Sequence, residues 1–237
     1  MPPDLTRGVF ETLLARDGRV QALPAHLRRL TRSVATLYGA ELPPELPGAV
    51  PAAAAPLAGE HRVRVDVVPG DTQEVTWRIR TSPLAAQRPR WYRCRPAPAV
   101  GGLGSHKWSD RRSLAALAAG GDDTVALLVD EHGDLLEAAW ANVWLLDGDR
   151  LVTPPADGRI LPGVTRARLI ALAPSLGLQP SEEPLAPARA QAVPQRLLTS
   201  SLALAAAFTL PGETAPTPEA LTAADRIRDA LGAGDWT

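Results

Sequence analysis

Hydrophobic and polar residues alternate along several short segments near the start of the chain, and this period-two pattern predicts β-strands. Two pairs of such segments each enclose a short turn sequence: 9–15 with 19–23, and 62–68 with 74–81. The turns contain Asp17-Gly18 and Pro69-Gly70, which favour a tight reversal of the chain. Each pair therefore predicts an antiparallel hairpin.

Apolar residues recur every three or four positions in other segments, which is the spacing of one helix face. The clearest case begins at Pro24 and stops at Gly39. Further helices are predicted at three segments: 109–119, 163–176 and 218–231. The segment 41–59 is rich in proline and alanine, so only a helical turn at 52–55 is expected there.

The remaining apolar runs predict a set of short strands: 91–95, 124–129, 135–138, 142–146, 151–153 and 196–200. Hairpins mixed with helices, without strict alternation, predict an α+β fold with largely antiparallel pairing. Segment 81–89 has two prolines and little periodicity, and it is the predicted linker. We therefore expect a small N-terminal α+β domain at residues 1–84 and a larger C-terminal domain at residues 85–237.

The composition is that of an ordinary globular protein, with 45% apolar and 22% charged residues among 237. A net charge of −1 gives no electrostatic reason to expect nucleic acid as a partner. Cys94 is the single cysteine and the histidines lack metal-binding spacing, so neither a disulfide nor a metal site is predicted. No apolar run reaches the ~18–20 residues of a membrane span, and residues 1–8 lack signal-peptide features. We expect a cytoplasmic protein.

Lysine use is the sharpest feature of the composition. Lysine and arginine together number 25, yet Lys107 is the only lysine. Arginine replaces lysine readily as a surface charge, but only an amine can lose its proton and form a Schiff base with a carbonyl carbon. Lys107 is therefore either a chance surface charge or the one position where arginine would not work.

A constellation of motifs spans residues 8–208. Its central part consists of Glu137-Ala138-Ala139-Trp140-Ala141-Asn142, Leu151-Val152-Thr153 and Leu161-Pro162-Gly163-Val164-Thr165-Arg166. The flanking parts are Gly8-Val9-Phe10-Glu11-Thr12, His26-Leu27-Arg28-Arg29-Leu30, His106-Lys107-Trp108-Ser109-Asp110-Arg111 and Leu198-Thr199-Ser200-Ser201-Leu202. In this order the motifs resemble the class-IV aminotransferase family. The chain departs from the family pattern at Trp144, where the family usually has Phe or Tyr, and in the short segment before Gly8.

The resemblance implies a two-domain fold-type IV pyridoxal-phosphate enzyme, like the D-amino-acid aminotransferases, whose larger domain binds the cofactor. It implies that Lys107 is the catalytic residue, which forms the Schiff base with pyridoxal 5′-phosphate and moves the substrate proton. It places Glu137 at the pyridine nitrogen and Asn142 beside it as a supporting hydrogen-bond partner. The groups implied for binding the phosphate are a helix start and neighbouring side chains: Val164, Thr165, Arg29, Ser200 and Ser201.

Three further assignments accompany this interpretation. Arg111 is expected one helical turn after Lys107, where its charge helps to favour the neutral amine. Trp108, Trp140 and Trp144 are assigned to core or dimer packing, with pocket lining as the alternative. Several arginines are assigned to solvated surface, with binding of a substrate carboxylate as the alternative: Arg28, Arg32, Arg88, Arg90, Arg93 and Arg95.

The resemblance ranks transamination of an amino-acid-type substrate first. It implies a homodimer that binds a small-molecule amino substrate, and neither nucleic acid nor a membrane. Two alternatives stay open. One is a 4-amino-4-deoxychorismate lyase, which releases pyruvate and p-aminobenzoate. The other is a non-catalytic homologue that binds pyridoxal phosphate without turnover.

Overall fold

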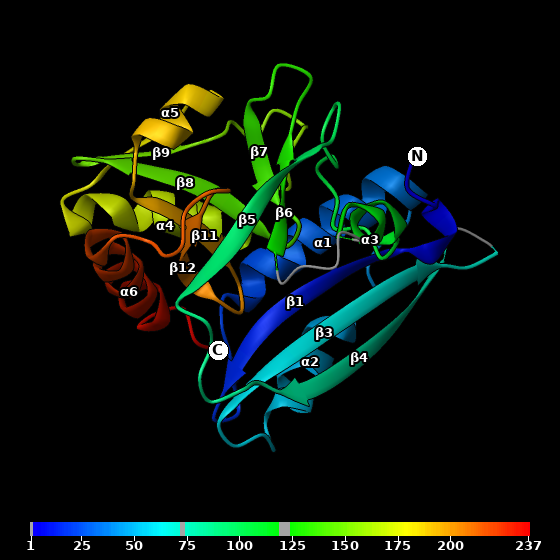
Figure 1. The fold of residues 1–237 in the computed structure, drawn as a ribbon. Coiled ribbons are helices and arrows are strands. Elements are labelled where there is room, and N and C mark those ends of the chain that lie inside the picture. Colours follow the sequence, from blue (N-terminus) through cyan, green and yellow to red (C-terminus); the bar gives the residue numbers. More distant parts are fainter. Residues whose placement is uncertain (1, 72–73, 119–123) are drawn as a thin grey trace. The chain divides into compact units, whose positions relative to one another are not determined.

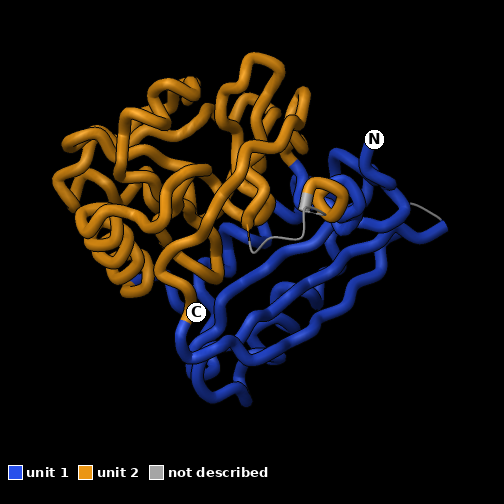
Figure 2. The backbone as a smooth tube through the Cα atoms, viewed as in Figure 1, with its two compact units in different colours: residues 1–87, 106–113, 234–237 blue, residues 88–105, 114–233 orange. Residues whose placement is uncertain are grey.

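The computed structural model describes residues 2–71, 74–118 and 124–237. The chain forms two compact units, which Figure 2 shows in different colours. Unit 1 comprises residues 1–87, 106–113 and 234–237, and unit 2 comprises residues 88–105 and 114–233. The predicted domains have a single boundary after residue 84, whereas the two units exchange further segments. Trp108 bridges to Val9 and Trp236 bridges to Gln21, so residues 106–113 and 234–237 belong to unit 1.

The described residues of unit 1 form a four-stranded antiparallel sheet in the order β2-β1-β3-β4 (Figure 1). The strands have these bounds: β1 (Val9–Arg16), β2 (Arg19–Val20), β3 (Glu60–Pro69) and β4 (Val75–Pro83). Both predicted hairpins are confirmed, since β1 pairs with β2 and β3 pairs with β4. In the first turn, Asp17 and Gly18 have φ angles of 48° and 79°, the left-handed pair that a two-residue hairpin turn favours.

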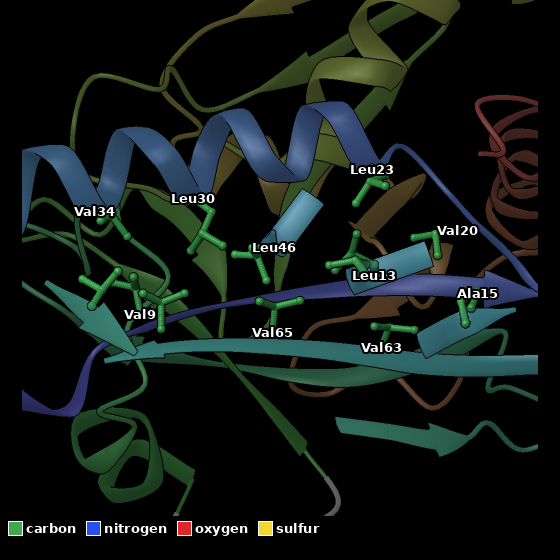
Figure 3. Close-up of a cluster of buried hydrophobic side chains, with 14 of the residues drawn as sticks. Val9, Leu13, Ala15, Val20, Leu23, Leu30, Val34, Leu46, Val63 and Val65 are labelled. Atoms are coloured by element: carbon green, nitrogen blue, oxygen red, sulfur yellow. The ribbon is translucent and has the colours of Figure 1, made fainter. Parts of the chain in front are cut away.

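Two helices pack against the apolar face of this sheet: α1 (Leu23–Tyr38) and α2 (Leu46–Ala54). Alternate residues of β3 are buried on this face: Val63, Val65 and Val67. Figure 3 shows Leu30 and Val34 of α1 directed toward the strands. Burial of each such side chain contributes about 1.5–3 kcal/mol, so this layer supplies much of the stability of unit 1.

Helix α1 confirms the predicted helix and its end, because Gly39 has a φ of 61° and its N–H donates to the Ala35 carbonyl. Helix α2 is longer than the predicted turn at 52–55. Three of its apolar residues, four positions apart, are fully buried: Leu46, Val50 and Ala54. This packed face stabilises the helix although Pro51 lies inside it.

Residues 107–109 run beside strand β1. Trp108 forms a β-bridge with Val9, and the N–H of Phe10 donates to the Lys107 carbonyl at 2.9 Å. These contacts extend the sheet at the edge of β1 and fix the backbone that carries the only lysine.

Helix α3 (Arg112–Ala118) begins later than the predicted helix at 109–119. Asp110 accepts a hydrogen bond from the N–H of Arg112 at the helix start. Arg111 therefore does not lie one helical turn after Lys107, since the backbone groups of 107–109 bond to β1 instead of starting a helix. The last residue of the predicted helix, Ala119, lies outside the described residues.

The described part of unit 2 contains an eight-stranded sheet in the order β10-β9-β8-β11-β12-β5-β6-β7. The strands have these bounds: β5 (Trp91–Pro98), β6 (Thr124–Val129), β7 (Leu135–Ala138), β8 (Ala141–Asp147), β9 (Arg150–Thr153), β10 (Gln179–Glu182), β11 (Arg196–Ser200) and β12 (Leu204–Thr209). Strand β7 also pairs with β8, so the strands from β8 to β7 close into a ring. Most neighbouring strands are antiparallel, as predicted, but β5 is parallel to both β6 and β12, and β10 is parallel to β9.

The helical segments of unit 2 and the short one before β1 have these bounds: η1 (Leu5–Arg7), α4 (Val164–Leu172), η2 (Ala173–Leu176), α5 (Pro187–Ala192) and α6 (Pro218–Gly232). Strand β12 was not predicted because its alanine-rich sequence has weak strand propensity. Every residue of β12 is nevertheless buried, so packing rather than propensity decides its conformation. No helix in the described part of the chain is long and apolar enough to cross a membrane.

Gly8 at the start of β1 offers a test of this packing. Its φ is 80°, and a Cβ there would lie 2.1 Å from the Val67 carbonyl oxygen. Gly8→Ala is therefore expected to lower the free energy of unfolding by roughly 3–5 kcal/mol through combined strain and overpacking. Urea denaturation measures the loss.

Gly59→Ala is the matched control. Gly59 also has a positive φ, 75°, but no atom lies within 4 Å of the Cβ position. Only the left-handed backbone conformation opposes alanine there, which costs about 1–2 kcal/mol. Equal losses in the two variants would show that the contact with the β3 backbone is unimportant.

Candidate functional site

Lys107 lies on the backbone segment that strand β1 holds in place. Its side chain is half-buried, and its Nζ lies 4.9 Å from the centroid of the Phe10 ring. A cation is attracted to the negative face of an aromatic ring, and this contact restricts the motion of a long side chain. The lone amine is therefore held against the sheet by both its backbone and its side chain.

A buried charge cluster lies between β1 and α1, formed by Glu11, His26 and Arg29. The Arg29 Nε and Nη2 donate to the two oxygens of the Glu11 carboxylate, each at 2.7 Å. The His26 Nδ1 lies 2.7 Å from Glu11 Oε2. All three residues are at most 8% exposed. A two-pronged contact of this kind fixes the plane of the guanidinium.

Burial and charge set the protonation states of this cluster. Burial disfavours the Glu11 carboxylate, but the neighbouring Arg29 and His26 outweigh it and lower the pKa of Glu11 to about 2. Burial also lowers the pKa of His26 from 6.5; Glu11 opposes this shift, and the charges of Arg29 and Lys107 add to it. Near neutral pH, Glu11 is therefore ionised and His26 is neutral.

Glu137 and Asn142 lie opposite each other on the hairpin of β7 and β8, and both are buried. The N–H of Leu161 donates to the Glu137 carboxylate at 3.3 Å, and the Leu161 carbonyl accepts from Asn142 Nδ2 at 2.9 Å. The backbone of one residue thus holds both side chains. This contact joins the β7–β8 hairpin to the segment that leads into α4.

The start of α4 has no room for a side chain at residue 163. A Cβ on Gly163 would lie 1.9 Å from Asn142 Oδ1. Gly163 is the N-cap of α4, and no side chain caps the helix. The N–H groups of the first turn, those of Val164 and Thr165 included, have no partner within the helix and carry its positive dipole end, so this terminus suits an anion.

Strand β11 lies beside β8 and ends in a turn at residues 200–203. Thr199 pairs with Asn142 in the strand register, and its hydroxyl accepts from Trp144 Nε1 at 2.8 Å. Ser200 Oγ accepts from the backbone N–H three residues later at 3.3 Å. Trp144 is fully buried, in line with its assignment to the core. The motif at 198–202 contains Thr199 but does not predict its bond to Trp144, because that bond depends on strand register.

The predicted site residues fall in both units. Lys107 and Arg29 belong to unit 1, and the others belong to unit 2: Glu137, Asn142, Val164, Thr165, Ser200 and Ser201. In unit 1 the structure adds Glu11 and His26, to which the sequence analysis assigned no role. The signal for Glu11 was present in the sequence, since it lies on the same face of β1 as the core residues Val9 and Leu13, where a charged side chain needs a partner.

No group of three or more His, Cys, Asp or Glu side chains within residues 2–71, 74–118 and 124–237 is arranged to hold a metal ion. In unit 1 the groups described above are the Lys107 amine and the buried pair of Glu11 and Arg29; in unit 2 they are the Glu137 carboxylate, hydroxyls and the α4 start. An amine suits a carbonyl group, and a helix start suits an anion.

Comparison with known families agrees with this chemistry. A family model described as amino-transferase class IV matches residues 8–209. The match covers most of the chain, so the protein belongs to the aminotransferase class IV family. Members of this family are pyridoxal-phosphate-dependent enzymes, transaminases or lyases.

Individual relatives show the same likeness. Over 70 residues the chain is 43% identical to a "Probable branched-chain-amino-acid aminotransferase" of Rickettsia felis, a match that spans 30% of this chain and only 23% of that protein. A hypothetical aminotransferase from Mycobacterium tuberculosis, solved with alpha-ketoglutarate and PMP bound, has a TM-score of 0.84 and 26% identity, covering 96% of this chain and 88% of that one. A 4-amino-4-deoxychorismate lyase from Pseudomonas aeruginosa shares the fold at a TM-score of 0.74 and 22% identity, covering 94% and 91%.

The described residues fit pyridoxal 5′-phosphate. Lys107 is the only side-chain amine for the aldehyde. Glu137 is a buried carboxylate suited to a protonated ring nitrogen, and the α4 start has the N–H donors that a phosphate needs. Asn142 approaches residue 163 so closely that only glycine fits there. Because glycine has no side chain, residue 163 does not cover the helix start.

The buried cluster predicts a stability effect with a defined pH dependence. Glu11→Gln leaves Arg29 buried beside a neutral partner, which is expected to cost about 3–5 kcal/mol at neutral pH. Because the pKa of Glu11 falls from 4.5 to about 2 on folding, its stabilising effect is complete above pH 4.5 and is lost as the pH falls toward 2. Urea unfolding of both proteins across this range should show their difference shrinking with acid.

Glu60→Gln is the control for this substitution. Glu60 pairs with Arg16 at 2.7 Å on the same sheet, but the two side chains are 25% and 39% exposed. An exposed pair contributes about 0–1 kcal/mol. A loss in Glu11→Gln no larger than in Glu60→Gln would contradict the importance of the buried cluster.

Proposed function

We propose that the protein is a transaminase that moves an amino group from an amino-acid-type substrate and uses Lys107 as its catalytic residue. The observation that carries this proposal is a single lysine, fixed beside Phe10 on a β-sheet, in a chain of the class IV family. When bound, pyridoxal 5′-phosphate supplies an aldehyde for amines and a ring that accepts electrons from the substrate's α-carbon.

Lys107 would hold the cofactor through its Nζ and would accept the proton from the substrate α-carbon. Arg64 lies over the same Phe10 ring as Lys107, with its Cζ 3.6 Å from the ring centroid, so a guanidinium lies beside the half-buried amine.

Glu137 keeps the pyridine nitrogen protonated in this proposal. Its carboxylate is 6% exposed and accepts from the Leu161 N–H, so it is held in a fixed position. Asn142 supports the same segment through the Leu161 carbonyl. A carboxylate held in this way stabilises a positive ring nitrogen without any motion of its own during the reaction.

The phosphate is proposed to bind at the start of α4. The backbone N–H groups of Val164 and Thr165 and the Thr165 hydroxyl are the main donors, and Ser200 and Ser201 are proposed as further donors. Arg29 contributes charge, and Glu11 fixes the orientation of its guanidinium. We also propose that the enzyme is cytoplasmic and forms a homodimer. Analytical ultracentrifugation of the purified protein tests the oligomeric state.

A second candidate is a 4-amino-4-deoxychorismate lyase, supported by the fold shared with such lyases over nine-tenths of both chains. The same residues serve both reactions until the α-proton has moved to Lys107. Lys107 would carry that proton in either reaction, and the bound cofactor would supply the chemistry that yields a 2-oxo acid in transamination or pyruvate in the lyase reaction.

The role of Lys107 is tested by trapping. Borohydride reduction of the protein with pyridoxal 5′-phosphate is expected to fix the cofactor to the peptide that contains Lys107, as read by mass spectrometry. Lys107→Ala and Lys107→Arg should give no such label, because a guanidinium keeps the charge but does not bond the aldehyde. A cofactor that is still trapped on a side chain in Lys107→Ala would overturn the assignment.

The reaction type is tested with a panel of D- and L-amino acids and with aminodeoxychorismate. A transaminase is expected to form the 2-oxo acid and leave the cofactor in its amine form. A lyase would instead give pyruvate and p-aminobenzoate in equal amounts. Absence of turnover with every compound, despite trapping at Lys107, would favour a non-catalytic binding protein and contradict both candidates.

A further inference from the structure

The segment that leads into α4 holds Glu137 and Asn142 through the backbone of Leu161. Residues 154–163 contain neither helix nor strand. The segment therefore lacks the repeated backbone bonds of a regular element, and only contacts with its surroundings keep it in place. The position of Leu161, and with it the position of the Glu137 carboxylate, depends on what the preceding residues contact.

Ile160 fixes this segment only in part. Its side chain is 1% exposed and packs in the same apolar cluster as Leu136, the neighbour of Glu137 on β7. This burial holds the segment against the sheet. Burial of apolar surface has no preferred direction, however, so it does not set the orientation of the peptide group that follows. Directed polar contacts must supply that orientation.

The side chain of Arg159 makes one such contact. Its Nη1 donates to Asp130 Oδ2 at 2.9 Å, in the turn between β6 and β7. The Asp130 carboxylate is 2% exposed, and its other oxygen accepts from the N–H groups of His132 and Asp134, each at 2.9 Å. The turn thus fixes the carboxylate, which directs its second oxygen at the guanidinium. This pair joins the segment to the strand pair that carries Glu137.

The backbone of Arg159 makes a second contact. Its carbonyl accepts from the Leu103 N–H at 3.2 Å, and a Cβ on Gly102 would lie 1.9 Å from the same carbonyl oxygen. Both residues belong to the turn after β5, where the Ala99 N–H donates to the Val129 carbonyl at 2.8 Å. Strands β5, β6 and β7 are neighbours in the sheet (Figure 1). Arg159 is therefore held on two sides by turns at the ends of these strands.

We propose that Arg159 and Asp130 are a positioning pair for the cofactor ring. They keep Leu161 where its N–H holds the Glu137 carboxylate in place for the protonated pyridine nitrogen. The inference rests on the role that the proposed function gives to Glu137. Arg159 acts through the Leu161 backbone and not by contact with the cofactor. A carboxylate stabilises a positive charge best when it is fixed in advance, so a loosened segment should weaken the hold on that proton.

The first test measures the ring proton directly. The protein is loaded with pyridoxal 5′-phosphate labelled with nitrogen-15 in the ring, and the resonance of that nitrogen distinguishes a protonated from a neutral pyridine. Arg159→Gln and Asp130→Asn are each expected to shift the resonance toward the neutral value. Asp130→Asn retains an oxygen for the two N–H groups of its turn, so it removes the contact with Arg159 at little cost to folding. An unshifted resonance in the folded variants would overturn the proposal.

Cofactor affinity is the second measurement. Calorimetry of the cofactor-free protein should give a Kd for pyridoxal 5′-phosphate that is about two- to tenfold higher in each variant, the effect of one weakened hydrogen bond. The double variant should lose no more than either single variant, because both substitutions break the same contact. Additive losses would show that Arg159 and Asp130 act independently and would contradict a pair.

Arg150→Gln is the matched control. Arg150 lies in the same unit and its Nη2 donates to Glu183 at 2.6 Å, so the substitution also removes one positive charge and one ion pair. This pair involves no residue of the segment 154–163. The nitrogen resonance and the Kd should therefore match those of the unmodified protein. Equal changes in Arg150→Gln and Arg159→Gln would overturn the proposal, since loss of general charge would then explain them.

Glu137→Gln separates this inference from the proposed function. If Glu137→Gln leaves the nitrogen resonance unchanged, the proposed role of Glu137 is wrong and the positioning pair has no target. If Glu137→Gln shifts the resonance but Arg159→Gln and Asp130→Asn do not, only the positioning pair is wrong. A lower Tm in these two variants with an unshifted resonance would show a purely structural pair and would equally overturn the inference.

Discussion

The backbone pairing between residues 107–109 and strand β1 is the constraint on which the proposed chemistry depends. The bonds of this pairing, one from the Phe10 N–H to the Lys107 carbonyl and one from the Ser109 N–H to the Gly8 carbonyl, make the lysine segment an extension of a sheet. Strand β1 is in turn paired with β3 along its whole length. The position of the reactive amine is therefore decided by strands that are distant from it in the sequence.

The elements that the sequence predicts well are those whose pattern is local. The two hairpins of unit 1 and helix α1 follow from alternation, turn residues and a glycine stop. Strand β12 and helix α2 required tertiary packing, because alanine and proline give weak or adverse local signals. The segment after Lys107 shows the same limit, since its hydrogen bonds to β1 prevent an earlier helix start.

The candidate site also shows what local sequence patterns cannot predict. Motifs identified the residue types, Lys107, Glu137 and Asn142 among them, but not their partners. The two-pronged contact of Glu11 with Arg29 and the joint contact of Glu137 and Asn142 with Leu161 depend on register between segments. Residue identity can be read from one segment, whereas a hydrogen bond between segments cannot.

The arginine-rich composition has a chemical consequence that the structure makes concrete. An aldehyde cofactor reacts with any accessible amine, and a guanidinium offers no such amine at physiological pH. With Lys107 as the only lysine, the positive charge of the buried cluster comes from Arg29, which pairs with Glu11 and does not compete for the aldehyde. Replacing Arg29 by lysine would lose the two-pronged contact with Glu11 and add a second amine in the same unit as Lys107. The use of arginine instead of lysine thus restricts imine formation by side chains to one position.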